Sequence, residues 1–220
     1  MILHLDLSGN RLTTVDGAFT GMKDLSRLDL SGNRLASLTQ FTLRDLNNLR
    51  FLFLANNTIS SVDKRAFRGL EKLSQLVLRG NPIGGIPVGV QPPGGTPPSG
   101  TPIGGSAVGD GSAATAAGGV TVRFQFNSLS LSYVDLSECS LTRLPRGLPS
   151  SIRYLQLRRN NLTTVSRNSF KDYPYTSILV LDENQVSGDV TFNDCSYTRV
   201  LVLVENQVSG DVPVKMVISS

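Results

Sequence analysis

The chain has 220 residues, of which 40% are hydrophobic and 17% charged, a balance typical of a folded, water-exposed protein. Its formal net charge is +4, but the basic residues are scattered and their densest cluster contains no interleaved aromatic residues, which argues against nucleic-acid binding. No run approaches the roughly 18 apolar residues that a membrane-spanning helix requires, so the sequence predicts no transmembrane segment in this chain.

Apolar residues recur with a fixed period over residues 1–86. The pattern Leu5-x-Leu7-x-x-Asn10-x-Leu12 returns three times, and its asparagines stand 23, 24 and 24 positions apart. A Leu-x-Leu pair has the period of a strand, so both leucines point to one side, and successive short strands can stack in parallel around a shared interior. Between the strands, one large apolar residue per repeat is expected to close this interior. The asparagines are Asn10, Asn33, Asn57 and Asn81, and the closing residues are Phe19, Leu43 and Phe67.

This pattern resembles the leucine-rich-repeat family, in the class with repeats of about 24 residues that is common in animal extracellular proteins. The resemblance implies an α/β-type repeat solenoid, a horseshoe whose concave face is a short parallel sheet. Each repeated asparagine would lie in the turn after a strand, where its amide can bond backbone groups of neighbouring turns.

Residues 87–121 interrupt the repeats. This stretch is rich in Gly, Pro, Ala and Ser and has few side chains to bury. It predicts a disordered linker or a long insert. A proline-rich ligand for another protein module is the alternative, but no basic residue flanks the prolines.

The repeats resume over residues 122–220, where Cys139 stands at the first asparagine position and Asn160, Asn184 and Asn206 stand at the next three. The stretch that begins at Cys139 resembles the start of the repeat arrays of Slit-like proteins and small leucine-rich proteoglycans, and internal repeats of Toll-like receptors read similarly. We expect about four repeats in each block, with a degenerate C-terminal end to the second. The two blocks are either joined by a tether or docked on each other.

Residues that carry chemistry are few. Two cysteines and one histidine cannot build a metal cluster or a catalytic dyad with its partner, and no phosphate-binding loop or nucleophile elbow is present. We therefore expect no enzyme activity, no metal and no cofactor. A disulfide between Cys139 and Cys195 is disfavoured, because their strands should lie farther apart than a disulfide allows. Two free thiols are the alternative.

Two acceptor sequences for N-glycosylation, at Asn56 and Asn161, each adjoin a repeated asparagine. They favour an extracellular or cell-surface location, with the cytoplasm as the alternative. The chain begins within a repeat, without a signal sequence, and shows no capping segment, so we expect a fragment of a longer protein.

Ligand contacts are expected on the concave face, where the residues on either side of each strand leucine point outward. Two neighbouring phenylalanines there are typical of an interface. Alternatively, the linker or a missing repeat covers them. The candidate ligand-binding residues are Arg27, Asp29, Phe51, Phe53, Gln75, Val77, Tyr133, Tyr154, Gln156 and Arg158.

The sequence thus predicts a protein-binding module of a receptor or adhesion ectodomain that recognises a protein or glycan ligand, with a protein ligand or co-receptor as partner. An intracellular scaffold of the same architecture is the first alternative. The second is the recognition module of a larger enzyme, such as a ubiquitin-ligase effector or a receptor kinase.

Overall fold

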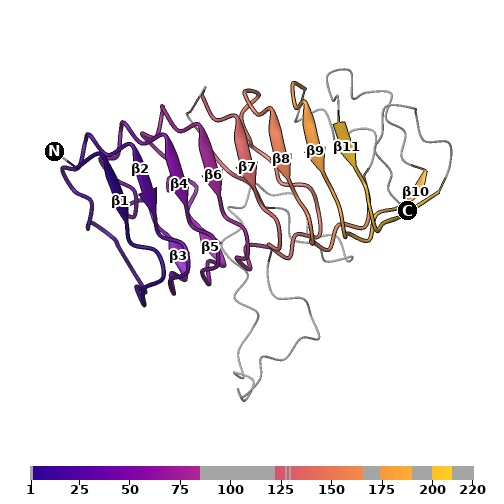
Figure 1. The fold of residues 1–220 in the computed structure, drawn as a ribbon, viewed down its shortest axis with the longest axis horizontal. Coiled ribbons are helices and arrows are strands. Elements are labelled where there is room, and N and C mark those ends of the chain that lie inside the picture. The colour runs from indigo at the N-terminus through magenta and orange to yellow at the C-terminus, as the bar shows by residue number, and fades with distance from the viewer. Residues whose placement is uncertain are drawn as a thin grey trace, which may run out of the picture.

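The computed structural model describes residues 2–84, 122–126, 128, 130–165, 174–189 and 200–209. The predicted linker at 87–121 lies outside these residues, as does Cys195. Within the described ranges the chain winds into a solenoid, and one strand of each turn joins an eight-stranded parallel sheet (Figure 1). The parallel-sheet solenoid predicted from the repeats is confirmed. The strands of this sheet, in spatial order, are β1 (His4–Asp6), β2 (Arg27–Asp29), β4 (Phe51–Phe53), β6 (Gln75–Val77), β7 (Tyr133–Asp135), β8 (Tyr154–Gln156), β9 (Ile178–Val180) and β11 (Val200–Val202).

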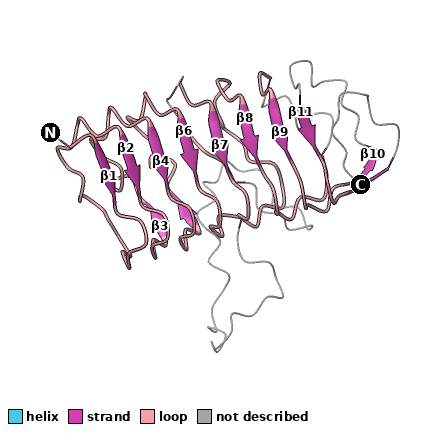
Figure 2. Ribbon diagram, in the orientation of Figure 1, coloured by secondary structure: helices cyan, strands magenta, loops and turns pink. Residues whose placement is uncertain are grey.

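The rest of each described turn consists of loops and tight turns (Figure 2). Two short parallel pairs supplement the main sheet: β3 (Ser37–Leu38) with β5 (Ser61–Val62), and β10 (Ser187–Asp189) with β12 (Gln207–Ser209). Three-residue strands suffice here because each is paired on both sides by its neighbours, except at the ends of the sheet.

The interior of the solenoid is filled by the apolar residues that recur at the same positions in each repeat. The central residues of neighbouring strands lie in register, for example Leu28 opposite Leu52 and Leu52 opposite Leu76, and all three are buried. On the other side of the interior, the predicted closing residues Phe19, Leu43 and Phe67 are buried as well. Burial of these apolar side chains supplies the main stabilisation of the fold.

The two repeat blocks form one continuous sheet, so they are docked on each other. Strand β6 pairs with β7 in the same register as every other pair, with Gln75 opposite Tyr133. In this pair 58 positions separate Leu76 from Val134, whereas 24 separate Leu52 from Leu76. Phe124 and Phe126 also contact Phe67, with ring centroids 6.2 and 4.7 Å from that ring, so the core is continuous across the junction.

An asparagine in the turn after each strand links adjacent turns. The Asn57 Nδ2 donates to the carbonyl of Leu54 in its own turn, at 3.1 Å, and to that of Leu30 in the preceding turn, at 3.0 Å. Its Oδ1 accepts the backbone N–H of Leu35 at 3.0 Å. These bonds satisfy backbone groups that the irregular turn leaves without strand partners. The same cross-turn bonds occur at Asn33, Asn81, Asn160, Asn184 and Asn206, whereas Asn10 in the first turn bonds within its own turn.

Cys139 occupies one of these asparagine positions. Its sulfur lies 3.3 Å from the carbonyl oxygen of Leu78 and 3.4 Å from that of Ser137, and its single S–H is shared between these two acceptors in place of an amide NH2. Cys139 is buried and is a free cysteine in the structure. Burial raises the pKa of the Cys139 thiol to about 12, because the interior disfavours a thiolate. The residue is therefore a structural thiol of low reactivity.

We predict that Asn57→Ala lowers the free energy of unfolding by about 3 kcal/mol, because the substitution leaves several buried backbone groups without a partner. Asn10→Ala is the matched control, since Asn10 is exposed and bonds only within its own turn; its effect should stay below about 1 kcal/mol. Urea denaturation of both variants measures the difference. Equal effects would contradict the structural role of the cross-turn bonds.

We also predict that Cys139 makes stability depend on alkaline pH. The pKa is higher in the folded chain than its ordinary value of 9.0, so the stabilisation is complete below pH 9 and is lost as the pH rises from about 9 towards 12. Relative to Cys139→Ala, which cannot titrate, the native chain should lose roughly 1.4 kcal/mol per pH unit in this window. Denaturation of both proteins at pH 8 and pH 10.5 under reducing conditions tests this; a difference that does not change with pH would contradict it.

Candidate functional site: the concave face of the sheet

The candidate site is the outward face of the eight-stranded sheet, here called the concave face. The first residues of the strands form one row across it, with Arg27, Phe51, Gln75, Tyr133 and Tyr154 as successive neighbours. The third residues form a second row, with Asp29, Phe53, Val77, Asp135 and Gln156 in the same order. Nine of the ten predicted ligand-binding residues belong to these rows, and Arg158 follows two positions after the end of β8. Arg27 and Arg158 are exposed and the other eight are half-buried.

The N-terminal part of this face carries a cation, a carboxylate and an aromatic ring in contact. The guanidinium of Arg27 lies 4.2 Å from the ring centroid of Phe53 and 3.9 Å from the Asp29 carboxylate. The Asp29 Oδ1 also accepts the backbone N–H of Ser31 at 3.0 Å. Asp29 therefore orders the end of its strand as well as pairing with Arg27, and Arg27 covers one face of Phe53.

The middle of the face carries two stacked tyrosines. The rings of Tyr133 and Tyr154 lie 5.0 Å apart at an interplanar angle of 21°. The Gln156 Nε2 donates to the Tyr154 hydroxyl at 3.1 Å, which fixes the orientation of that ring. Burial raises the pKa of the Tyr133 hydroxyl, and the neighbouring Asp135 and Tyr154 add to the rise, so this hydroxyl is neutral at physiological pH.

Asp135 lies on the concave face, as its place in the repeat predicts, but it is not one of the ten candidate ligand-binding residues. It lies in the second row between Val77 and Gln156 and is only 6% exposed, although it belongs to the outward face of the sheet. A signal was available, because the pattern Asp-x-Ser occurs at 6–8, 29–31 and 135–137. In all three places the aspartate Oδ1 accepts the serine N–H.

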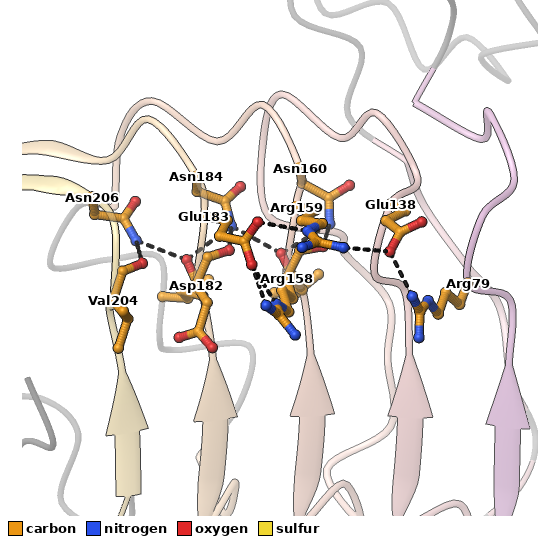
Figure 3. A network of polar contacts seen from close by, with 12 residues as sticks. Arg79, Glu138, Arg158, Arg159, Asn160, Asp182, Glu183, Asn184, Val204 and Asn206 are labelled. Atoms are coloured by element: carbon orange, nitrogen blue, oxygen red, sulfur yellow. Dashed lines mark hydrogen bonds and ion pairs between the residues drawn. The ribbon is translucent and has the colours of Figure 1, made fainter. Parts of the chain in front are cut away.

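A chain of ion pairs runs along the ends of strands β6 to β9 (Figure 3). The guanidinium of Arg79 pairs with the Glu138 carboxylate at 2.7 Å. The guanidinium of Arg159 lies between two carboxylates, that of Glu138 at 3.7 Å and that of Glu183 at 2.5 Å. Arg158 also bonds Glu183. Hydrogen bonds from Arg159 and Arg158 lower the pKa of Glu183. The predicted ligand-binding residue Arg158 is therefore already engaged by a glutamate.

Three of these charged residues occupy an unusual backbone position. The residue immediately before each repeated asparagine, and before Cys139 at the corresponding position, has a left-handed backbone conformation throughout the described turns, with φ between 51° and 71°. In the first block this residue is Gly9, Gly32, Asn56 or Gly80, and a side chain on Gly80 would require the Asn56 side chain to shift. In the second block it is Glu138, Arg159, Glu183 or Glu205.

The two glycosylation candidates differ in accessibility. Asn56 is exposed, and it is the left-handed residue immediately before Asn57. Asn161 is half-buried, and its backbone N–H donates to the carbonyl of Leu141 at 2.8 Å. Of the two, Asn56 offers the side chain that is freer for modification.

Other features of the described residues do not add a second site on this face. A hollow of about 350 Å³ lies in the turns after β3 and β5, away from the two rows; its lining includes Phe41, Arg44, Arg65 and Arg68. Within the described ranges, no three His, Cys, Asp or Glu residues come together as a metal site would require. No helix in these ranges has the length and apolar character to cross a bilayer.

Comparisons with known proteins agree with this architecture. The sequence model of the family described as leucine rich repeat matches residues 2–35 and 25–83. Fibromodulin of Oryctolagus cuniculus is 30% identical over 140 residues, which are 64% of this chain and 71% of that protein. Podocan-like protein 1 of Mus musculus is 28% identical over 178 residues, or 74% of this chain, and decorin of Rattus norvegicus is 27% identical over 208 residues, or 83%. The chain spans 31% of the podocan-like protein and 49% of decorin.

Solved structures show the same fold. A chain in the structure of the Toll–Spatzle complex, described as a hub in Drosophila development and innate immunity, matches 94% of this chain and 27% of its own length, with a TM-score of 0.60 and 18% identity. The APL1 leucine-rich-repeat domain matches 87% of this chain and 40% of its own, with a TM-score of 0.58 and 17% identity. At these identities the likeness concerns the fold alone.

The sequence relatives are non-enzymatic small leucine-rich proteoglycans of the extracellular matrix, at distant identity. Because fibromodulin is 30% identical and 71% of its length is covered, the chain belongs to the leucine-rich-repeat family.

Proposed function

We propose that this chain is the protein-binding module of an extracellular leucine-rich-repeat protein, and that its ligand binds the concave face. The observation that carries the proposal is the set of large aromatic side chains in that face. Phe51, Phe53, Tyr133 and Tyr154 are all partly exposed, although the central residues of the same strands, Leu52, Val134 and Leu155, are buried.

Partly exposed aromatic residues on a rigid support favour binding. Each can bury apolar area against a ligand, at roughly 25 cal/mol per Å², and aromatic residues are frequent among those that dominate interface energies. The strands that carry them are paired on both sides and joined by the asparagine bonds. Little conformational entropy is therefore lost when a ligand binds.

The extracellular location is supported by two independent observations. The relatives are matrix proteoglycans, and the acceptor sequence at Asn56 lies on an exposed residue. The finer assignment, to a receptor or adhesion ectodomain with a protein or glycan ligand, is part of this proposal. The partner is expected to be a protein that meets the face through the two rows of strand residues.

We predict that the double variant Phe51→Ser, Phe53→Ser weakens binding of a protein ligand roughly 30-fold, equivalent to about 2 kcal/mol. Binding is measured by biolayer interferometry of the immobilised chain against a panel of purified secreted proteins. Phe41→Ser is the matched control, because Phe41 is 48% exposed but lies in the turn after β3, off the concave face. Ligands that lose affinity only with Phe41→Ser would overturn the assignment of the concave face.

We further predict that the chain carries an N-linked glycan on Asn56 when it is expressed with a signal peptide in a mammalian secretory host. Enzymatic removal of N-glycans should lower its mass, and Asn56→Gln should abolish most of that change, because Asn56 is the more exposed acceptor. Asn161→Gln is the comparison variant. A secreted chain without any N-glycan would remove this support for an extracellular location.

A further inference from the structure

Asp135 is a buried carboxylate on a face that otherwise meets solvent. It is 6% exposed, and its Oδ1 accepts the backbone N–H of Ser137 at 2.9 Å. Within the described part of the chain, no arginine or lysine forms an ion pair with it. Burial of an ionised carboxylate is costly unless a cation or several donors compensate it, so one N–H bond leaves Asp135 with capacity for a cation.

Asp29 shows how the same arrangement looks when it is complete. Asp29 and Asp135 occupy the same position in strands β2 and β7, and both accept the N–H of the serine two residues later. Asp29, however, has the Arg27 guanidinium at 3.9 Å, and that group also lies over the Phe53 ring. On this face, then, a carboxylate and a neighbouring aromatic ring are complemented by an arginine.

At Asp135 the aromatic part is present and the arginine is absent. Tyr133 stands in β7 where Arg27 stands in β2, and Tyr154 stacks on it from the next strand. The nearby arginines do not supply the missing charge. Arg79 pairs with Glu138 and Arg158 with Glu183, at the strand ends in Figure 3.

A second polar group beside Asp135 is also without a partner. The hydroxyl of Ser137 is buried, in a residue that is 3% exposed, and it makes no hydrogen bond with the described residues. Ser137 begins the turn after β7, and its backbone N–H bonds the Asp135 carboxylate. This bond holds the Ser137 residue beside that carboxylate. A buried hydroxyl without a partner costs free energy, which a ligand donor would recover.

We propose that this part of the concave face binds an arginine side chain of the protein ligand. The guanidinium pairs with the Asp135 carboxylate, donates to the Ser137 hydroxyl and lies against the Tyr133–Tyr154 pair. A planar guanidinium can do all three at once, since it presents a fork of donors and stacks on aromatic rings, whereas an ammonium is a compact, strongly hydrated charge. The inference rests on the proposed function and names the chemistry of its ligand.

The test is an NMR titration of the full chain, with tyrosine rings labelled with carbon-13, against Nα-acetyl-arginine N-methylamide. The citrulline analogue has the same shape without the charge and serves as the control ligand. We expect the Tyr133 and Tyr154 ring resonances to shift with the arginine compound and to stay in place with the citrulline compound. Asp135→Asn retains the acceptor for the Ser137 N–H, and it should weaken arginine binding at least tenfold. Asp63→Asn is the matched variant, because Asp63 also accepts the backbone N–H two residues later but follows β5, off the concave face; it should leave binding unchanged.

Several outcomes overturn the inference: equal shifts with citrulline, equal affinity of Asp135→Asn, or an equal response to the corresponding lysine compound. Thermal unfolding checks that Asp135→Asn is folded, and Tyr154→Ala, at a half-buried position, gives a second variant that should weaken binding. Different results would overturn the arginine site and the proposed function. If the aromatic double variant loses a protein ligand while the arginine compound gives no shift, only the arginine site is overturned. A clear arginine response combined with protein binding away from the concave face overturns only the proposed function.

Discussion

The cross-turn hydrogen bonds of the repeated asparagines are the constraint on which the rest of this molecule depends. Each turn of a solenoid of this kind contains irregular backbone whose N–H and C=O groups have no strand partner, and these groups are buried by the next turn. One carboxamide has donors for two carbonyls and an oxygen for an N–H, so a single side chain such as Asn81 can serve both turns that it touches. Three-residue strands can then follow one another in a constant register, and the flanking side chains form ordered rows.

The rows explain why residues far apart in sequence act together. Phe51 meets Gln75, and Gln75 meets Tyr133 from beyond the interruption of the repeats. Ligand binding by such a face would therefore depend on which side chains neighbouring strands bring together. Asp29 and Asp135 both accept the N–H of the serine two residues later. They differ in the residue two positions before them, which is Arg27 in β2 and Tyr133 in β7, and in their neighbour in the row, which is Phe53 for one and Gln156 for the other.

The fold could be predicted from the sequence because each repeat contains the strand leucines and the closing residue of its own turn. The same turn then stacks on its neighbour in every repeat. The pairing of β6 with β7 could not be decided, since the intervening stretch has no period that reports whether the two blocks meet. The burial of Asp135 was also out of reach, because its place in the repeat predicts an outward-facing side chain and does not report how far neighbouring strands cover it. The engagement of Arg158 depends on Glu183 in the next turn, 25 positions away, and nothing in the local pattern of either residue indicates that they meet.

The left-handed residue before each repeated asparagine, or before Cys139, is of a different kind in the two repeat blocks. Where this residue is Gly32 or Gly80, it adopts the left-handed conformation because it has no Cβ, and it carries no charge that ionic strength could affect. Where this residue is Glu138, Arg159 or Glu183, the side chain reaches into an exposed chain of charges that dissolved ions screen. The turns that end strands β7 to β9 are therefore more responsive to the ionic composition of the surrounding fluid than the turns in which glycine holds this position.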